Sequence, residues 1–183
     1  MPHRLRPPRP PLPRFAVAWF PDFDGIERIE AFRARHDPMA ALVPAHLSLV
    51  FPFATAQSAL QVGTHVQRVV ARFPPVSVTF RPVRLFANEF LFLMATRGAA
   101  AVAELHDRLY TRSLRTKLRH DLAYEPHVTL ARNADLAALE RAHAEAQDEF
   151  GGEFTAVMRE VSLLAVGQDG RIERLRDIAL HTL

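Results

Sequence analysis

His46-Leu47-Ser48-Leu49 and His127-Val128-Thr129-Leu130 are the two stretches that decide the fold. Each reads histidine, apolar residue, hydroxyl residue, apolar residue. Alternate side chains of a strand share a face, so each histidine points the same way as its hydroxyl while the apolar residues enter a core. Composition alone predicts about 0.17 such tetrapeptides in the chain. None of the other histidines has Ser or Thr two residues later. The pair predicts two equivalent half-polar strands.

Similar elements surround both tetrapeptides. The two histidines lie 81 residues apart, and two expected hairpin turns, at Asn88 and Gly170, lie 82 apart. Hydrophobic periodicity predicts helices over 24–35 (capped by Asp24), 57–73, 99–118 and 135–150. It predicts strands over 15–20, 46–51, 76–87, 89–96, 127–132, 153–166 and 171–180. This repeat of two predicts an α+β fold with two pseudo-symmetric lobes, each an antiparallel sheet with helices outside. We expect the two histidine strands to pair near the pseudo-twofold axis and to line a central cleft.

The charge of the 183-residue chain is unevenly distributed. The formal net charge is +3, but residues 1–14 alone contain four Arg and six Pro with no acidic residue. The remaining residues carry 19 basic and 20 acidic side chains, so the net charge is no argument for a nucleic-acid partner. We predict a Pro/Arg-rich arm over 1–14 and a single bilobal domain over 15–183, which is an ordinary domain length.

The composition indicates in which cellular compartment the protein functions and excludes several kinds of functional site. The chain has no Cys, which excludes disulfides, thiolate zinc sites and cysteine nucleophiles and fits a reducing compartment. The arm has no apolar segment of a secretory signal, and its prolines oppose the amphipathic helix of a transit peptide. No apolar run approaches the roughly 18 residues of a membrane span. We expect a cytoplasmic monomer without membrane contact.

Two histidines and two hydroxyls around one cavity suit phosphodiester chemistry. Imidazole titrates near neutrality, so one ring can accept a proton while the other donates one. Hydrolysis of a 2′,3′-cyclic phosphate needs water deprotonated on one side of phosphorus and the departing ribose oxygen protonated on the other. The hydroxyls of Ser48 and Thr129 can hold the non-bridging oxygens. This pattern predicts a reaction that needs neither metal nor cofactor.

The segments PAHLSLVFPF (44–53) and EPHVTLAR (125–132) resemble the paired His-x-Thr-x motifs of the 2H phosphoesterase superfamily, especially its bacterial 2′-5′ RNA ligase / RNA 2′,3′-cyclic phosphodiesterase branch. The resemblance extends over 15–183 in element order. It implies a metal-independent bilobal enzyme in which His46 donates a proton to the leaving oxygen and His127 accepts one from water. Ser48 and Thr129 match the positions that hold phosphate, although the family usually has Thr where Ser48 stands.

Three further residues are candidates for lining the substrate site. Phe51 matches an apolar or aromatic position after the first motif, and Arg132 a basic position after the second. A strictly alternating strand turns Arg132 away from Thr129, whereas a bulge or strand end would return it to the same face. Tyr124 either stacks on a base at the edge of the cleft or packs against the protein.

Other interpretations of the same residues remain open. The two histidines could be structural and satisfied by nearby backbone. A zinc site is a weaker alternative, because two strand histidines supply only two ligands and no third has the usual spacing. Arg108, Arg112, Arg115 and Arg119 would share one face of the expected helix, either as an RNA track or as a solvated surface.

The sequence therefore predicts an enzyme that hydrolyses 2′,3′-cyclic phosphodiester termini of RNA or nucleotides, its substrates and partners being RNA ends or cyclic nucleotides. Joining of RNA ends through a 2′-5′ linkage would use the same two histidines in the reverse-type reaction. A non-catalytic RNA- or nucleotide-binding protein of the same fold is the alternative function.

Overall fold

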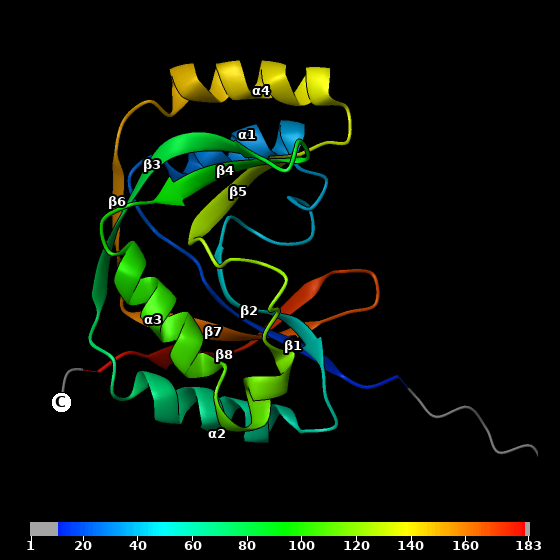
Figure 1. The fold of residues 1–183 in the computed structure, drawn as a ribbon, viewed down its shortest axis with the longest axis vertical. Helices are drawn as coiled ribbons and strands as arrows, with labels where there is room; N and C mark the ends of the chain where they lie inside the picture. Colours follow the sequence, from blue (N-terminus) through cyan, green and yellow to red (C-terminus); the bar gives the residue numbers. More distant parts are fainter. Residues whose placement is uncertain (1–10, 182–183) are drawn as a thin grey trace, which may run out of the picture.

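Strands and helices alternate along the chain largely as the hydrophobic pattern predicts (Figure 1). The structure is a computed structural model and describes residues 11–181; residues 1–10 of the predicted arm lie outside this range. Arg14, which the sequence analysis places in the arm, is the first residue of a strand. The strands are β1 (Arg14–Trp19), β2 (Leu47–Ala54), β3 (Val76–Phe86), β4 (Phe90–Ala95), β5 (His127–Arg132), β6 (Phe154–Met158), β7 (Glu160–Val166) and β8 (Ile172–Ala179). The α-helices are α1 (Ile26–His36), α2 (Ala59–Val70), α3 (Ala99–Leu109) and α4 (Leu136–Glu149).

The strands form two four-stranded antiparallel sheets, which confirms the predicted α+β architecture of two lobes. One sheet has the order β2-β1-β7-β8 and the other β5-β4-β3-β6. The two histidine strands do not pair with each other, contrary to the expectation: β2 pairs with β1, and β5 with β4. β1 and β4 are almost entirely buried and lie inside their sheets, where they form the backbone hydrogen bonds with the half-polar strands β2 and β5. β2 and β5 thus each form one edge of their sheet, and residues of these two strands are in contact.

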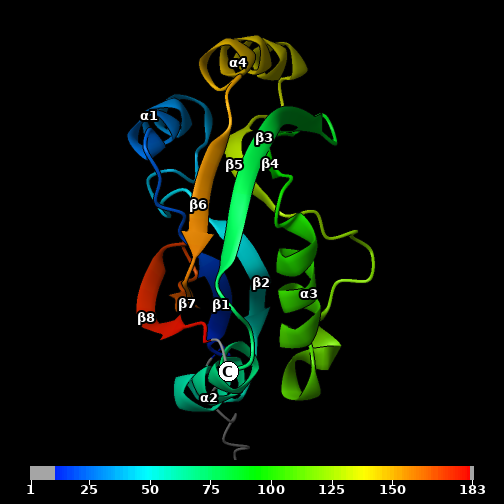
Figure 2. The same ribbon diagram turned by 90° about the vertical axis from the view of Figure 1, so that its left-hand side faces the viewer.

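Each lobe draws on both halves of the sequence, which the simple repeat did not predict. The expected strand over 153–166 is divided at Arg159: β6 joins the second sheet, and β7 continues into the first (Figure 2). The helices are exchanged in the same way. α1 follows β1 but packs on β5, whereas α3 follows β4 but packs on β2. As a result, α1 and α4 cover one sheet while α2 and α3 cover the other (Figure 1).

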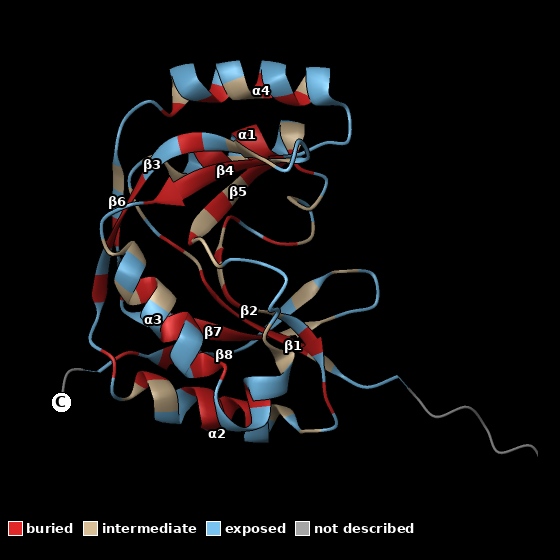
Figure 3. Cartoon of the chain, viewed as in Figure 1, coloured by how far each residue is buried: buried red, intermediate tan, exposed pale blue. Residues whose placement is uncertain are grey.

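Apolar side chains fill the space between these layers, and most exposed residues lie on outer helix faces and loops (Figure 3). The inward residues of both histidine strands belong to the same large core: Leu47, Leu49, Val128 and Leu130 are fully buried. Within residues 11–181, no helix is both long and apolar enough to cross a bilayer.

Local chemistry explains where the helices begin. Ser58 and Gln61 form a reciprocal capping box at the start of α2. Asp135 caps α4 by accepting from the amides of Ala137 and Ala138. The expected Asp24 cap of α1 is wrong, because the N-cap residue is Gly25, whose φ is +96°.

The predicted helix over 99–118 is also shorter than expected. α3 ends at Leu109, and a 3₁₀ helix follows over Arg112–Lys117. Arg112 has a φ of +50°, which is incompatible with a continuous right-handed helix. Arg108 pairs with Glu104, and Arg119 pairs with Asp121. The four arginines therefore do not share one helix face, so the alternative of an RNA track along a single helix has no support here.

Gly98 sets the entry of α3 and provides a stability test. Its φ is +80°, and a Cβ there would lie 2.3 Å from the carbonyl oxygen of Ser77. We expect Gly98→Ala to lower the free energy of unfolding by about 2 kcal/mol, measured by urea denaturation. Gly152→Ala is the matched control, because a Cβ there meets no atom within 4 Å; its expected change is below about 0.5 kcal/mol. Equal effects of the two changes would contradict this account of the helix entry.

Candidate active site

The imidazoles of the two motif histidines are held in the same way. The Nδ1–H of His46 donates to the carbonyl oxygen of Pro44 at 2.8 Å, and that of His127 donates to Glu125 at 2.6 Å. A carbonyl oxygen can only accept, so Nδ1 carries the proton in each neutral ring. Nε2 is then the nitrogen with a lone pair that is available for proton exchange.

The two motif strands also carry the same irregularity. In the β1–β2 ladder, Val50 pairs with Val17 and Ser48 pairs with Ala18, so Leu49 is skipped. In the β4–β5 ladder, Ala131 and Thr129 oppose consecutive residues of β4, so Leu130 is skipped. An extra residue resets the alternation of faces. Arg132 thereby returns to the side of Thr129, as the bulge alternative predicted.

A cavity of about 290 Å³ lies between the two lobes at these strands. It brings together His46, Ser48, Thr129 and Arg132 from the two motif strands. The remaining lining is partly basic, from Arg14, and largely apolar, from residues of the other strands of the first sheet. These apolar residues include Ala16, Ala18, Leu164, Val166 and Ile172. The cavity therefore has one polar side with the motif residues and an apolar floor on β1, β7 and β8.

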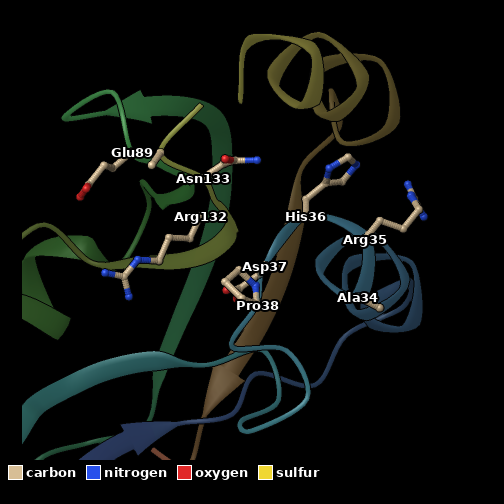
Figure 4. A pocket seen from close by; sticks show the side chains of 9 residues that line it. Ala34, Arg35, His36, Asp37, Pro38, Glu89, Arg132 and Asn133 are labelled. Carbon is tan, nitrogen blue, oxygen red and sulfur yellow. The ribbon is translucent and has the colours of Figure 1, made fainter. Parts of the chain in front are cut away.

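A larger pocket of about 600 Å³ adjoins the cavity on the side of α1 (Figure 4). It shares Asp37 and Arg132 with the cavity but contains neither motif histidine and neither motif hydroxyl. Arg35 and His36 at its rim are already paired with Glu145 of α4. We therefore place the candidate active site at the smaller cavity, which is lined by His46, both motif hydroxyls and Arg132.

His127 lies on the same face of β5 as Thr129 but is not among the residues that line the cavity. Its ring stacks on Phe92 of β4, with centroids 3.6 Å apart. Burial is the main cause that lowers the pKa of His127 below its ordinary value of 6.5, and the charge of His46 lowers it further. Burial likewise lowers the pKa of His46. The charge of His46 thus disfavours protonation of His127.

The structure does not bring Phe51 and Tyr124 to the cavity. The ring of Tyr124 stacks on His106 of α3, with centroids 3.6 Å apart, and its hydroxyl donates to the carbonyl oxygen of Ser48 at 2.8 Å. This is the packing alternative for Tyr124. Phe51 lies edge-on to both of these rings, and its amide donates to the hydroxyl of Tyr110. Tyr124 and Tyr110 therefore bond to the backbone of β2, and Phe51 of that strand packs against Tyr124 and His106.

Two features of the site were missed from sequence. Arg14 lines the cavity, although it had been assigned to the arm. Arg33 and Asp37 form a buried ion pair at the cavity wall. The signal for Arg33 was present: it falls four residues after Ile29, on the helix face expected to be apolar. Arg14 and Arg132 form no ion pair with a carboxylate among residues 11–181, so both guanidinium groups are free to bind an anion. No cluster of three or more metal-ligating side chains occurs in this part of the chain.

Comparison with known proteins assigns the family. The sequence model of the 2′-5′ RNA ligase superfamily matches residues 21–170, which contain both motifs. The chain belongs to this superfamily. The resemblance to 2H phosphoesterases seen in the sequence is thereby confirmed.

Relatives of this superfamily member are named as phosphoesterases or share its fold. A protein of Bacillus licheniformis named "Putative phosphoesterase" is 27% identical over 121 residues, 64% of this chain and 70% of that protein. One of the same name from Geobacillus thermodenitrificans is 25% identical over 137 residues, 73% and 76% of the two chains. The crystal structure of E. coli LigT in apo form matches with a TM-score of 0.64 at 19% identity, covering 93% and 98% of the chains. TT0787 of Thermus thermophilus matches with a TM-score of 0.62 at 18% identity, covering 91% and 97%.

The effect of His46 on the pKa of His127 can be measured directly in this superfamily member. We expect NMR titration to give His46 and His127 pKa values below 6.5, with Nδ1–H as the neutral tautomer of both. His46→Ala should raise the pKa of His127, because it removes a repulsive charge. A His127 pKa that does not change in this variant would show that the two rings do not interact.

Proposed function

We propose that this protein is a metal-independent phosphoesterase that hydrolyses 2′,3′-cyclic phosphodiester termini of RNA or nucleotides. The observation that carries the proposal is the matched tethering of His46 and His127, each with Nδ1 bound to backbone and Nε2 left for proton transfer. Two such groups on facing edge strands meet the requirement for one acid and one base.

The proposed reaction is an in-line displacement at phosphorus. Nε2 of His127 accepts a proton from water as the water oxygen bonds to phosphorus. Protonated His46 donates from Nε2 to the ribose oxygen as its bond to phosphorus breaks, giving a phosphomonoester and a free ribose hydroxyl. Ser48 and Thr129 donate hydrogen bonds to the non-bridging oxygens, and Arg14 and Arg132 balance the negative charge. With an RNA 5′-hydroxyl in place of water, the same proton transfers would join two ends through a 2′-5′ linkage.

The shape of the cavity favours a nucleotide end as the substrate. Its volume of about 290 Å³ lies at the small end of the range for ligand sites, which suits one nucleotide and not a long stretch of RNA. Ala16 and Ala18 leave a floor on which a flat ring can lie, and this floor offers no side-chain donor or acceptor to a base. We therefore expect little preference among the four bases. E. coli LigT, a protein of the same fold, has been crystallised with 3′-AMP, which supports this substrate class.

Replacement of either histidine tests the assignment. His46→Ala and His127→Ala should each lower kcat for a 2′,3′-cyclic nucleotide by on the order of 10² or more, because each removes one proton-transfer group. His120→Ala, in an exposed loop, is the matched control and should keep wild-type rates. Activity should persist in EDTA. Retained activity in both single variants would overturn the assignment, and loss with EDTA followed by rescue with zinc would favour a metal site.

The lowered pKa values predict an acid-shifted pH profile. Catalysis needs one neutral and one protonated imidazole, and kcat/KM reports the free enzyme. Burial lowers the pKa of both rings below 6.5, so the donor loses its required proton as pH rises through its own lowered pKa. At lower pH, the acceptor becomes protonated. We expect a bell-shaped profile with its maximum below pH 6.5, reported as the two apparent values of the pair. A plateau extending to pH 8 would contradict these pKa directions.

A substrate panel distinguishes the enzyme from a binding protein. The panel contains the four 2′,3′-cyclic nucleotides, oligonucleotides with a cyclic phosphate end, 2′-5′-linked dimers and ADP-ribose 1″,2″-cyclic phosphate. We expect turnover of cyclic phosphates at rates within about threefold among the bases, with products assigned as 2′- or 3′-phosphates by mass and NMR. Tight binding of cyclic-ended RNA without any product would instead identify a non-catalytic binding protein.

A further inference from the structure

A charged cluster on α1 lies behind the first motif and takes no part in the proposed proton transfers. It consists of Glu30, Arg33 and Asp37, on one face of the helix and its C-cap. Arg33 is only 1% exposed. Its guanidinium bonds to Asp37 at 2.9 Å and to Glu30 at 3.1 Å. The amide of Met39 donates to the second carboxylate oxygen of Asp37, so the carboxylate is held on both sides.

Two members of this cluster form hydrogen bonds with the backbone immediately before His46. Arg33 Nη2 donates to the carbonyl oxygen of Val43 at 3.1 Å, and the amide of Ala45 donates to Glu30 Oε1 at 2.6 Å. Between these two residues lies Pro44, whose carbonyl oxygen accepts the Nδ1–H of His46. The acceptor that orients the imidazole is therefore fixed by a hydrogen bond on each side.

In the part of the chain that the structure describes, no buried charged side chain bonds to the backbone just before His127; the amide of Ala95 on β4 donates to the carbonyl oxygen of Pro126 instead. The carbonyl of Glu125 orients His127, and the side chain of Glu125 pairs with Arg84 of β3. Both members of this pair are more than 40% exposed, so water and salt screen their attraction. The backbone before His46 is thus held by buried charged side chains of α1, whereas the charged pair beside His127 is exposed and the ring of His127 is held by its stacking on Phe92.

A buried ion pair is weak evidence for stability, because desolvation offsets its attraction. Its role here is geometric, because the three side chains contact one another and together fix the position of the backbone over 43–45. We propose that Glu30, Arg33 and Asp37 are positioning residues that set the orientation of the His46 imidazole for the reaction. This inference rests on the proposed function for its kinetic consequence, but its structural consequence can be measured separately.

Glu30 is the best residue for the test. Replacing Arg33 would leave Asp37 buried and unpaired, which endangers folding, whereas Glu30 is 36% exposed. Glu30→Ala removes the acceptor for the Ala45 amide. Glu30→Gln keeps an oxygen for that amide and should restore the wild-type geometry. Glu27→Ala is the matched control on the same helix, since Glu27 is exposed.

Each variant is examined by kinetics and by ¹⁵N NMR of the imidazoles, after thermal unfolding has confirmed that it folds. For a 2′,3′-cyclic nucleotide, Glu30→Ala should lower kcat on the order of 10-fold, with KM changed less than about twofold. Its His46 nitrogen signals should shift toward an average of the two tautomers, while those of His127 stay in place. Glu30→Gln and Glu27→Ala should resemble the wild type.

Unchanged His46 signals and kcat in Glu30→Ala would overturn the positioning role. Equal shifts at His46 and His127 would also overturn it, because they would indicate a general loosening of the site. If the wild type turns over no cyclic phosphate but the His46 signals alone respond to Glu30→Ala, the proposed function fails while the positioning of His46 stands.

Discussion

Two hydrogen bonds from imidazole Nδ1 to backbone, at His46 and at His127, are the constraint on which the rest of the site depends. Each turns a histidine at a strand end into a directed proton-exchange group, because the carbonyl two residues earlier accepts only from a protonated Nδ1. The buried apolar residues Leu47 and Val128 anchor the opposite faces of the same strands. The rings therefore cannot turn toward the core or into free solvent without breaking either a hydrogen bond or core packing.

The fold supports this constraint at β2, an edge strand whose open backbone is bonded by side chains from α3, its C-cap and the segment before β5. Behind β2, Tyr124 and His106 donate to the carbonyl oxygens of Ser48 and Leu49, and the amide of Phe51 donates to the hydroxyl of Tyr110. An edge strand with free donors and acceptors could slip or pair elsewhere, whereas this one is held in a single register. The exchange of α1 and α3 between the lobes allows it, because each helix reaches the histidine strand of the other half.

Much of the fold could be predicted from sequence because alternation and helical spacing are local signals. The motif strands, the hairpin turn near Asn88 and the existence of α2 and α4 follow from such patterns. The predictions that were wrong concern contacts between residues that are far apart in the sequence. Nothing local in 153–166 indicates that β6 and β7 enter different sheets, and nothing local shows that Tyr124 finds a partner in His106. For Arg132, the sequence left two orientations open, one for a regular strand and one for a bulged strand. Only the pairing of β5 with β4 shows that Leu130 is skipped and that the strand is bulged.

Attack of water on a cyclic phosphate between two histidines, without a metal, is the step that we propose. Its most direct test is ³¹P NMR of a 2′,3′-cyclic nucleotide incubated with the wild-type protein in H₂¹⁸O and EDTA. We expect conversion to a single phosphomonoester isomer that carries one ¹⁸O per phosphate. An unchanged cyclic signal, or a monoester that forms only after a divalent cation is added, would contradict it.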